Sequence, residues 1–153
     1  GNGDGAVDPA VAVMKQAGKW QFNGTVGGVI ALDSYRSTLL YDSWHVSVEA
    51  LPNLFPLVEL NHLRVLDEGN GGVRFKNQAE GAVPSIARFE AGDLVNFGAS
   101  NAKDNEDFVS LALGARYRTC SAATIGAAYE FPLTDEDATL MDYRVTVDVT
   151  INL

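Results

Sequence analysis

The 153-residue sequence contains one cysteine and two histidines, which excludes several kinds of site at the outset. A single thiol, Cys120, cannot form an internal disulfide, and no Cys/His spacing typical of a metal site occurs. A Gly-x-Ser-x-Gly motif, a Walker phosphate loop and a Cys/His nucleophile pair are also missing. We therefore predict a protein that is not an enzyme and has no metal site and no cofactor.

Long apolar runs are missing too, because no stretch approaches the roughly 18 apolar residues that a transmembrane helix needs. The composition is nevertheless 46% hydrophobic, with a mean hydropathy of −0.01, so the chain is not of the disordered type. A β-barrel can span a bilayer at this hydropathy, since only every second side chain of a strand has to be apolar. The opening GNGDGAVDPA lacks the basic start and apolar centre of a signal peptide, which predicts a processed chain or a fragment.

Basic residues are few, with 11 Lys and Arg against 20 Asp and Glu, and the formal net charge is −9. A nucleic-acid partner is excluded on this ground, because lysine and arginine must neutralise the phosphates. The acidic residues gather at 67–68, 104–107 and 135–137, between the more regular segments. We interpret these clusters as solvated loops.

The last eleven residues, YRVTVDVTINL, show what the sequence does contain. Apolar and polar side chains alternate at every position from Tyr143 to Leu153. Successive side chains of a strand point to opposite faces of the sheet, so this pattern predicts a β-strand with one apolar and one polar face.

The same alternation predicts six further strands, at 9–15, 20–32, 38–50, 55–66, 107–119 and 123–131. Several reach the roughly nine to eleven residues with which a tilted strand crosses a bilayer. Short turns (QAGK, LPNL, TCSA) alternate with long links, the longest being 67–106, as in outer-membrane barrels. We predict an all-β, antiparallel, up-and-down transmembrane β-barrel of seven or eight strands in residues 9–153, preceded by a loop-like segment 1–8. An even strand number requires either an extra strand at DLVNF (93–97) or strands outside this chain, and the loop-like start favours the second.

The orientation of the strands decides the function. The apolar rows of the last three strands carry no charge, aromatic residues lie near the row ends, and the opposite rows mix glycine and alanine with charges. Aromatic girdles at both headgroup levels are typical of membrane barrels. We therefore predict that the following residues face lipid: Val109, Leu111, Leu113, Tyr117, Ile125, Tyr129, Phe131, Tyr143, Val145, Val147, Val149 and Ile151.

The polar rows are predicted to line the lumen, through Arg116, Arg118, Glu130, Arg144, Asp148, His45, Glu49, Glu59 and Asn61. We expect the first five to form a charged ladder, which either sets ion selectivity or fills the bore. A turn at LPNL should place Ser47 or Glu49 opposite Glu59, with His45 near Asn61.

His62 and Arg64 interrupt an apolar row, which fits a strand leaving the membrane or a slipped register. The Asn2, Asp4 and Asp8 spacing echoes a calcium loop, but Val11 stands where a bidentate glutamate belongs, so a Gly/Asp-rich loop is favoured.

The terminal strand resembles the closing strand of Gram-negative outer-membrane β-barrels, although Leu153 departs from the usual final Phe or Trp. FPLVELN, GDLVNFGASN, LGARYR and IGAAYEFPLT are similar to segments of a bacterial family labelled as transporters or porin-like barrels, over most of residues 9–153. The resemblance implies a barrel in the bacterial outer membrane, longer at its N-terminus, and carries no catalytic residues.

Together these observations predict a passive, porin-like channel for small solutes, with the lipid bilayer as its main partner. Further barrel strands, another chain or another copy would complete the wall. Two alternatives stay open. One is a plugged structural or surface-interaction barrel that uses its acidic loops, and the other is a soluble ligand-binding β-barrel with an apolar interior.

Overall fold

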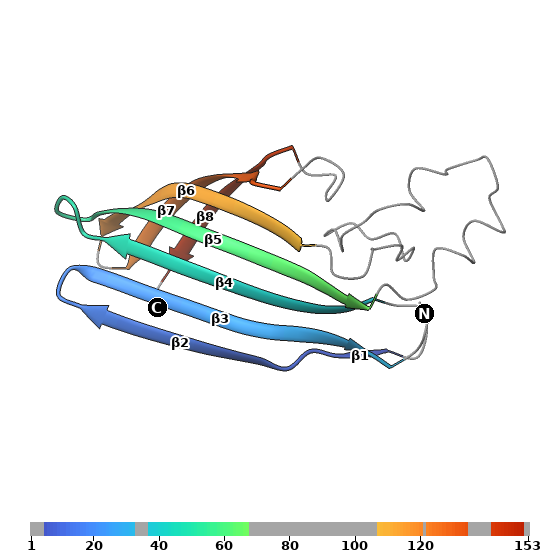
Figure 1. Cartoon of the computed structure of the whole chain (residues 1–153). Helices are drawn as coiled ribbons and strands as arrows, with labels where there is room; N and C mark the ends of the chain where they lie inside the picture. Colours follow the sequence, from blue (N-terminus) through green and yellow to red (C-terminus); the bar gives the residue numbers. More distant parts are fainter. Residues whose placement is uncertain (1–4, 33–36, 68–106, 121, 135–141, 152–153) are drawn as a thin grey trace.

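In the computed structural model, residues 5–32, 37–67, 107–120, 122–134 and 142–151 are described, and they form one antiparallel sheet (Figure 1). None of these residues is helical, so the described part contains no helix that is long and apolar enough to cross a membrane. The strands are β1 (Ala6–Val7), β2 (Ala10–Ala17), β3 (Trp20–Ala31), β4 (Thr38–Val48), β5 (Leu54–Asp67), β6 (Asp107–Cys120), β7 (Ala123–Pro132) and β8 (Arg144–Ile151).

Each strand from β3 to β8 pairs with the next one in the sequence, and β2 pairs with β3. The all-β, up-and-down antiparallel arrangement is therefore confirmed, and the predicted strand limits agree with the observed ones to within about two residues. At the β4–β5 turn, Asn53 has a φ of 67°, a left-handed conformation that asparagine tolerates better than most residues. The turns between β2 and β3 and between β4 and β5 lie at the same end of the sheet (Figure 1).

The first strand is interrupted. Ala6 and Val7 pair with Ala31 and Ile30, and β2 continues along the same edge of β3 with Ala10 opposite Gly27. The break falls at Asp8–Pro9, where proline has no N–H to donate to the ladder. Part of segment 1–8, expected to be loop-like, thus belongs to the sheet, and residues 1–4 lie outside the described part.

The sheet is not closed among the described residues: β2 with β1 forms one edge, and β8 forms the other. Every pairing between β2 and β8 is antiparallel, and six such steps separate the two strands. The two edge strands therefore run in the same direction. The barrel itself stays a prediction, as does the loop 67–106, of which residues 68–106 lie outside the described part.

The sheet curls so that β7 and β8 pass behind β4 and β5 in Figure 1. The face on the inside of the curl is identified by side chains that meet across an intervening strand. Asn61 of β5 donates to Glu130 of β7 over β6, at 3.2 Å, and Tyr41 of β4 donates to Asp8 over β3, at 2.8 Å. Side chains two strands apart can meet in this way only where the face is concave.

Candidate functional site on the two faces of the sheet

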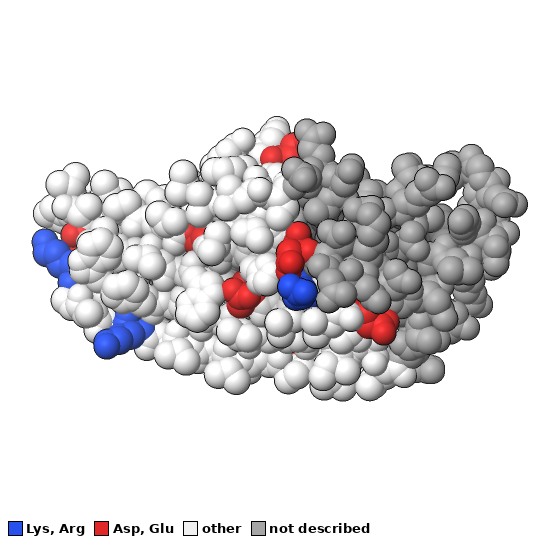
Figure 2. All heavy atoms as spheres, in the orientation of Figure 1, with Lys and Arg blue, Asp and Glu red and all other residues white. Residues whose placement is uncertain are grey.

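The two faces differ in polarity. The side of the sheet that carries Trp20, Trp44, Leu60, Leu113, Tyr129 and Val147 is what we call the apolar face, and the concave opposite side is the polar face. In the described part, almost all exposed large hydrophobic side chains belong to the apolar face, with Val147 at 69% exposure. Figure 2 shows mostly uncharged atoms there, with basic side chains at the short-turn end and acidic side chains, together with one basic group, further towards the other end.

All twelve residues predicted to face lipid lie on the apolar face. Tyr143 precedes β8, but its ring stacks on Tyr129 with 5.7 Å between ring centres, which places it on the same side. Phe131 also approaches Tyr129, at 6.1 Å, so three aromatic rings gather near the long-link end. Trp20 and Phe22 stack near the short-turn end, at 6.3 Å. The aromatic residues thus mark both ends of the apolar face, although contact with lipid itself stays a prediction.

Burial in the described part is inverted relative to a water-soluble domain. Five polar side chains are buried (Ser37, His45, Ser47, Ser110 and Glu130), against three apolar ones (Leu57, Val65 and Ala112). Every buried side-chain nitrogen or oxygen atom in this part has a hydrogen-bond partner. Water-soluble proteins bury mainly apolar side chains and keep acidic ones exposed unless paired. The interior of this curled sheet is therefore polar and internally satisfied.

Glu130 is the centre of the polar face. Its residue exposure is 5%, and its carboxylate accepts hydrogen bonds from Ser110 of β6 and from Asn61 of β5. Arg144, directly opposite on β8, forms an ion pair with the same carboxylate. Three other strands, β5, β6 and β8, thus supply donors to one buried negative charge on β7, and this satisfies the requirement that a buried charge be both paired and hydrogen-bonded.

A second ion pair crosses β7. Arg116 of β6 and Asp148 of β8 lie 3.7 Å apart, and both side chains are more than one-third exposed. Gly126 lies beneath them, and a Cβ there would overlap the Asp148 carboxylate. Arg118 stacks instead on the ring of Phe55, at 5.0 Å, near the short turns. The predicted ladder of five charges is therefore two separate ion pairs plus one arginine held by an aromatic ring.

The hairpin of β4 and β5 corrects one prediction. His45 stands directly opposite Glu59, with 3.3 Å between Nδ1 and Oε2, and Ser47 stands opposite Leu57. The expectation that Ser47 or Glu49 faces Glu59 is wrong, because the strands pair symmetrically about Pro52, one or two residues earlier than those two pairings require. Glu49 lies beyond the end of β4, where its carboxylate accepts from the Asn53 N–H at the turn. Glu49 therefore belongs to the turn and does not join the pair formed by His45 and Glu59.

The apolar face carries one polar cluster that the sequence did not reveal. His62 approaches Asp42 at 2.8 Å through Nδ1 and Asp107 at 2.9 Å through Nε2, and Arg64 approaches Asp107 at 3.2 Å. The indole N–H of Trp44 donates to the other oxygen of Asp42, at 2.7 Å. The β4–β5 register is continuous through His62, so the alternative of a slipped register there is wrong. The interrupted apolar row marks an ionic cluster near the long-link end.

Glycine on the polar face makes room for long side chains from neighbouring strands. The Tyr41 ring lies over Gly27, and its hydroxyl donates to Asp8. A Cβ on Gly27 would overlap this ring. We expect Gly27→Ala to lower the free energy of unfolding by about 1–3 kcal/mol, the usual cost of overpacking. Chemical denaturation of the reconstituted protein measures the change.

The matched control for this prediction is a double-mutant cycle. In a Tyr41→Ala background the ring is gone, so Gly27→Ala should then cost far less. An equal loss in both backgrounds would show that Gly27 is needed for its backbone and not for the space beneath Tyr41.

No group of three or more His, Cys, Asp or Glu residues in the described part is arranged to hold a metal ion. Of the calcium-like loop, only Asp8 is described, and its carboxylate accepts from Tyr41. No protein-family model, curated protein or solved structure matches this chain. The resemblance to transporter or porin-like barrels therefore stays a prediction, and the function has to be argued from the two faces.

Proposed function

We propose that this chain forms most of the wall of a β-barrel in a bacterial outer membrane and that its polar face lines a passage for small solutes. The observation that carries the proposal is the inverted burial, with large apolar side chains exposed on the convex side and a carboxylate, a histidine and serines buried on the concave side. Contiguous exposed apolar surfaces of this extent typically mark membrane or protein contacts. Membrane barrels have an apolar outside and a polar lumen.

A wall in lipid also has to close, because unpaired strand edges are not tolerated there. Since β2 and β8 run in the same direction, direct pairing between them would be parallel. An odd number of additional strands, running opposite to both, would keep the antiparallel alternation and give an even total, as in single-chain bacterial barrels. We infer that such strands come from further polypeptide and complete the barrel.

Passive conduction is the testable activity. The purified complete barrel should produce stepwise openings in planar bilayers, since the polar face provides hydrogen-bonding and charged groups along its length. Paired charges such as Glu130–Arg144 also suit a bore filled by its own side chains. Reconstitution that inserts the protein but never yields openings would reject the channel in favour of the plugged barrel.

Ion selectivity should depend on charges of the polar face and not on those of the apolar face. Arg118 and Lys15 both lie near the short-turn end, on the polar and the apolar face respectively. Arg118→Gln removes one positive charge from the passage, and we expect the permeability ratio to shift towards cations. The reversal potential in a salt gradient measures this ratio.

Lys15→Gln is the matched control, because it removes the same charge near the same end of the strands but on the opposite face. It should leave the reversal potential unchanged. An equal shift in both variants would mean that the measured selectivity arises outside the bore.

A further inference from the structure

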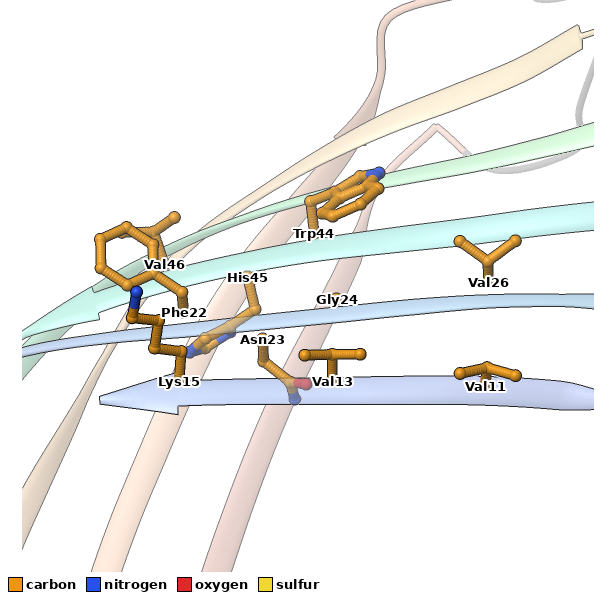
Figure 3. A pocket seen from close by; sticks show the side chains of 10 residues that line it. All are labelled: Val11, Val13, Lys15, Phe22, Asn23, Gly24, Val26, Trp44, His45 and Val46. Atoms are coloured by element: carbon orange, nitrogen blue, oxygen red, sulfur yellow. The ribbon is translucent and has the colours of Figure 1, made fainter. Parts of the chain in front are cut away.

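An apolar groove crosses β2, β3 and β4 on the apolar face. Its volume is about 510 Å³, within the usual range of small-molecule sites, and its walls come from Val11, Val13, Phe22, Val26, Trp44 and Val46 (Figure 3). The register places these side chains around one point, because Val13 and Trp44 flank Gly24 from the two neighbouring strands. The groove is therefore formed by regular strands.

Gly24 lets the Trp44 indole lie against β3 as one wall of the groove. A Cβ at this position would lie 2.8 Å from Cζ3 of Trp44, so the indole occupies the space that a side chain would fill. The indole N–H is already donated to Asp42, which leaves the ring to present only apolar surface to the groove. Asn23 and His45 also border the groove, but they alternate with its wall residues and belong to the polar face, so the valines and the two aromatic rings suit it to a hydrocarbon chain.

The short-turn end of the groove is different, because Lys15 stands there opposite Phe22 (Figure 3). Among the described residues, no acidic side chain forms an ion pair with Lys15. A lysine at the end of an apolar groove can keep its aliphatic stem on the apolar surface and its ammonium group at the headgroup level. Its charge is complementary to a phosphate attached to the chain that fills the groove.

We propose that this groove binds an anionic phospholipid, with one acyl chain against Val13, Gly24 and Trp44 and the headgroup phosphate at Lys15. The proposal rests on the proposed function, since it requires the apolar face to be in a bilayer. It is independent of how the barrel closes, because a strand added beside β2 extends the sheet sideways and leaves its apolar face uncovered. In barrels with short periplasmic turns, the lysine end would lie in the periplasmic leaflet.

The test uses Trp44 as a reporter, because the chain has only two tryptophans. In a Trp20→Phe background, the protein is reconstituted into vesicles of zwitterionic phosphatidylcholine that contain a small fraction of lipid with brominated acyl chains, which quench indole fluorescence on contact. Brominated phosphatidylglycerol should quench Trp44 at about fivefold lower content than brominated phosphatidylcholine, because one lysine near a surface contributes roughly this factor towards an anionic headgroup.

Two variants and their controls separate the parts of the site. Lys15→Gln should abolish the preference for phosphatidylglycerol, whereas Lys19→Gln in the adjacent turn should retain it. Val13→Phe should fill the groove and weaken quenching by both lipids, whereas Met14→Phe, on the opposite face of β2, should not. Retained electrophoretic mobility of the folded barrel shows that each variant still inserts.

The outcomes distinguish this inference from the proposed function. Quenching that is equal for both lipids, or a preference that survives Lys15→Gln, overturns the lipid site while leaving the membrane barrel intact. Absence of quenching by either lipid overturns both. A cross-linked dimer that Val13→Phe abolishes, without any lipid preference, would make the groove a contact between two copies and overturn the lipid site.

Discussion

Val147→Arg should destabilise the protein in a bilayer by about 2–4 kcal/mol, the cost of an arginine on the lipid side of a membrane barrel near the midplane. Val147 lies midway along β8, opposite Ala127, with its side chain 69% exposed on the apolar face. In water, a substitution at so exposed a position changes stability by only about 0.5 kcal/mol. The expected effect therefore comes almost entirely from lipid. Urea titration of folded protein in phospholipid vesicles measures it.

Two further arginine variants of the same strand serve as controls. Thr146→Arg places the guanidinium on the polar face, where we expect little loss. Ile151→Arg lies on the apolar face near the short-turn end, where the cost should fall to about 0–1 kcal/mol. A dependence on both face and depth is specific to a bilayer. Three equal, small effects would show that no membrane covers the apolar face.

The soluble alternative makes the opposite prediction. A ligand-binding barrel with an apolar interior needs Val145, Val147 and Val149 to meet in a dry centre, and Val147→Arg would then prevent folding in plain buffer. The exposures of these three side chains are 62%, 69% and 62%. Such exposure supports the membrane proposal, and the arginine series decides between the two.

The strands could be predicted from the sequence because a period of two is a local property. Each strand alternates within itself, as from Val145 to Ile151, and Gly18–Lys19 and Pro52–Asn53 mark their own turns. The assignment of residues to faces followed from the same alternation. Nothing beyond neighbouring residues was needed for either result.

Contacts between strands could not be predicted in the same way. The His62 cluster joins residues 20 and 45 positions apart, so a sequence pattern shows only an interrupted apolar row. The pairing of His45 with Glu59 depends on where the β4–β5 turn bends, and an error of one or two residues there shifts every partner. The space above Gly27 and Gly126 is occupied by side chains of adjacent strands, Tyr41 and Asp148, which the alternation within one strand does not show.

Glu130→Ala should lower the free energy of unfolding by about 3 kcal/mol, at the lower end of what removing one partner of a buried ion pair costs. The lower end applies because Arg144 is 43% exposed and can hydrate, whereas the Glu130 side chain is only 7% exposed. Ser110 and Asn61 also lose their acceptor, and Ser110 is fully buried, so its hydroxyl is left without its partner. Denaturant titration in vesicles measures the loss.

Asp148→Ala is the matched control, because it breaks the other ion pair of the polar face, that of Arg116, where both side chains are more than one-third exposed. Exposed pairs contribute at most about 1 kcal/mol, so this variant should remain close to the parent protein. A large difference between the two variants would show that Glu130 holds β5, β6, β7 and β8 together as one curled wall. Equal, small losses would mean that the curl depends on backbone pairing and on the apolar face alone.

Glu130→Gln separates the charge of this side chain from its shape. It keeps an acceptor for Ser110 and Asn61 but loses the ion pair with Arg144, so its loss of unfolding free energy should lie between those of Glu130→Ala and Asp148→Ala.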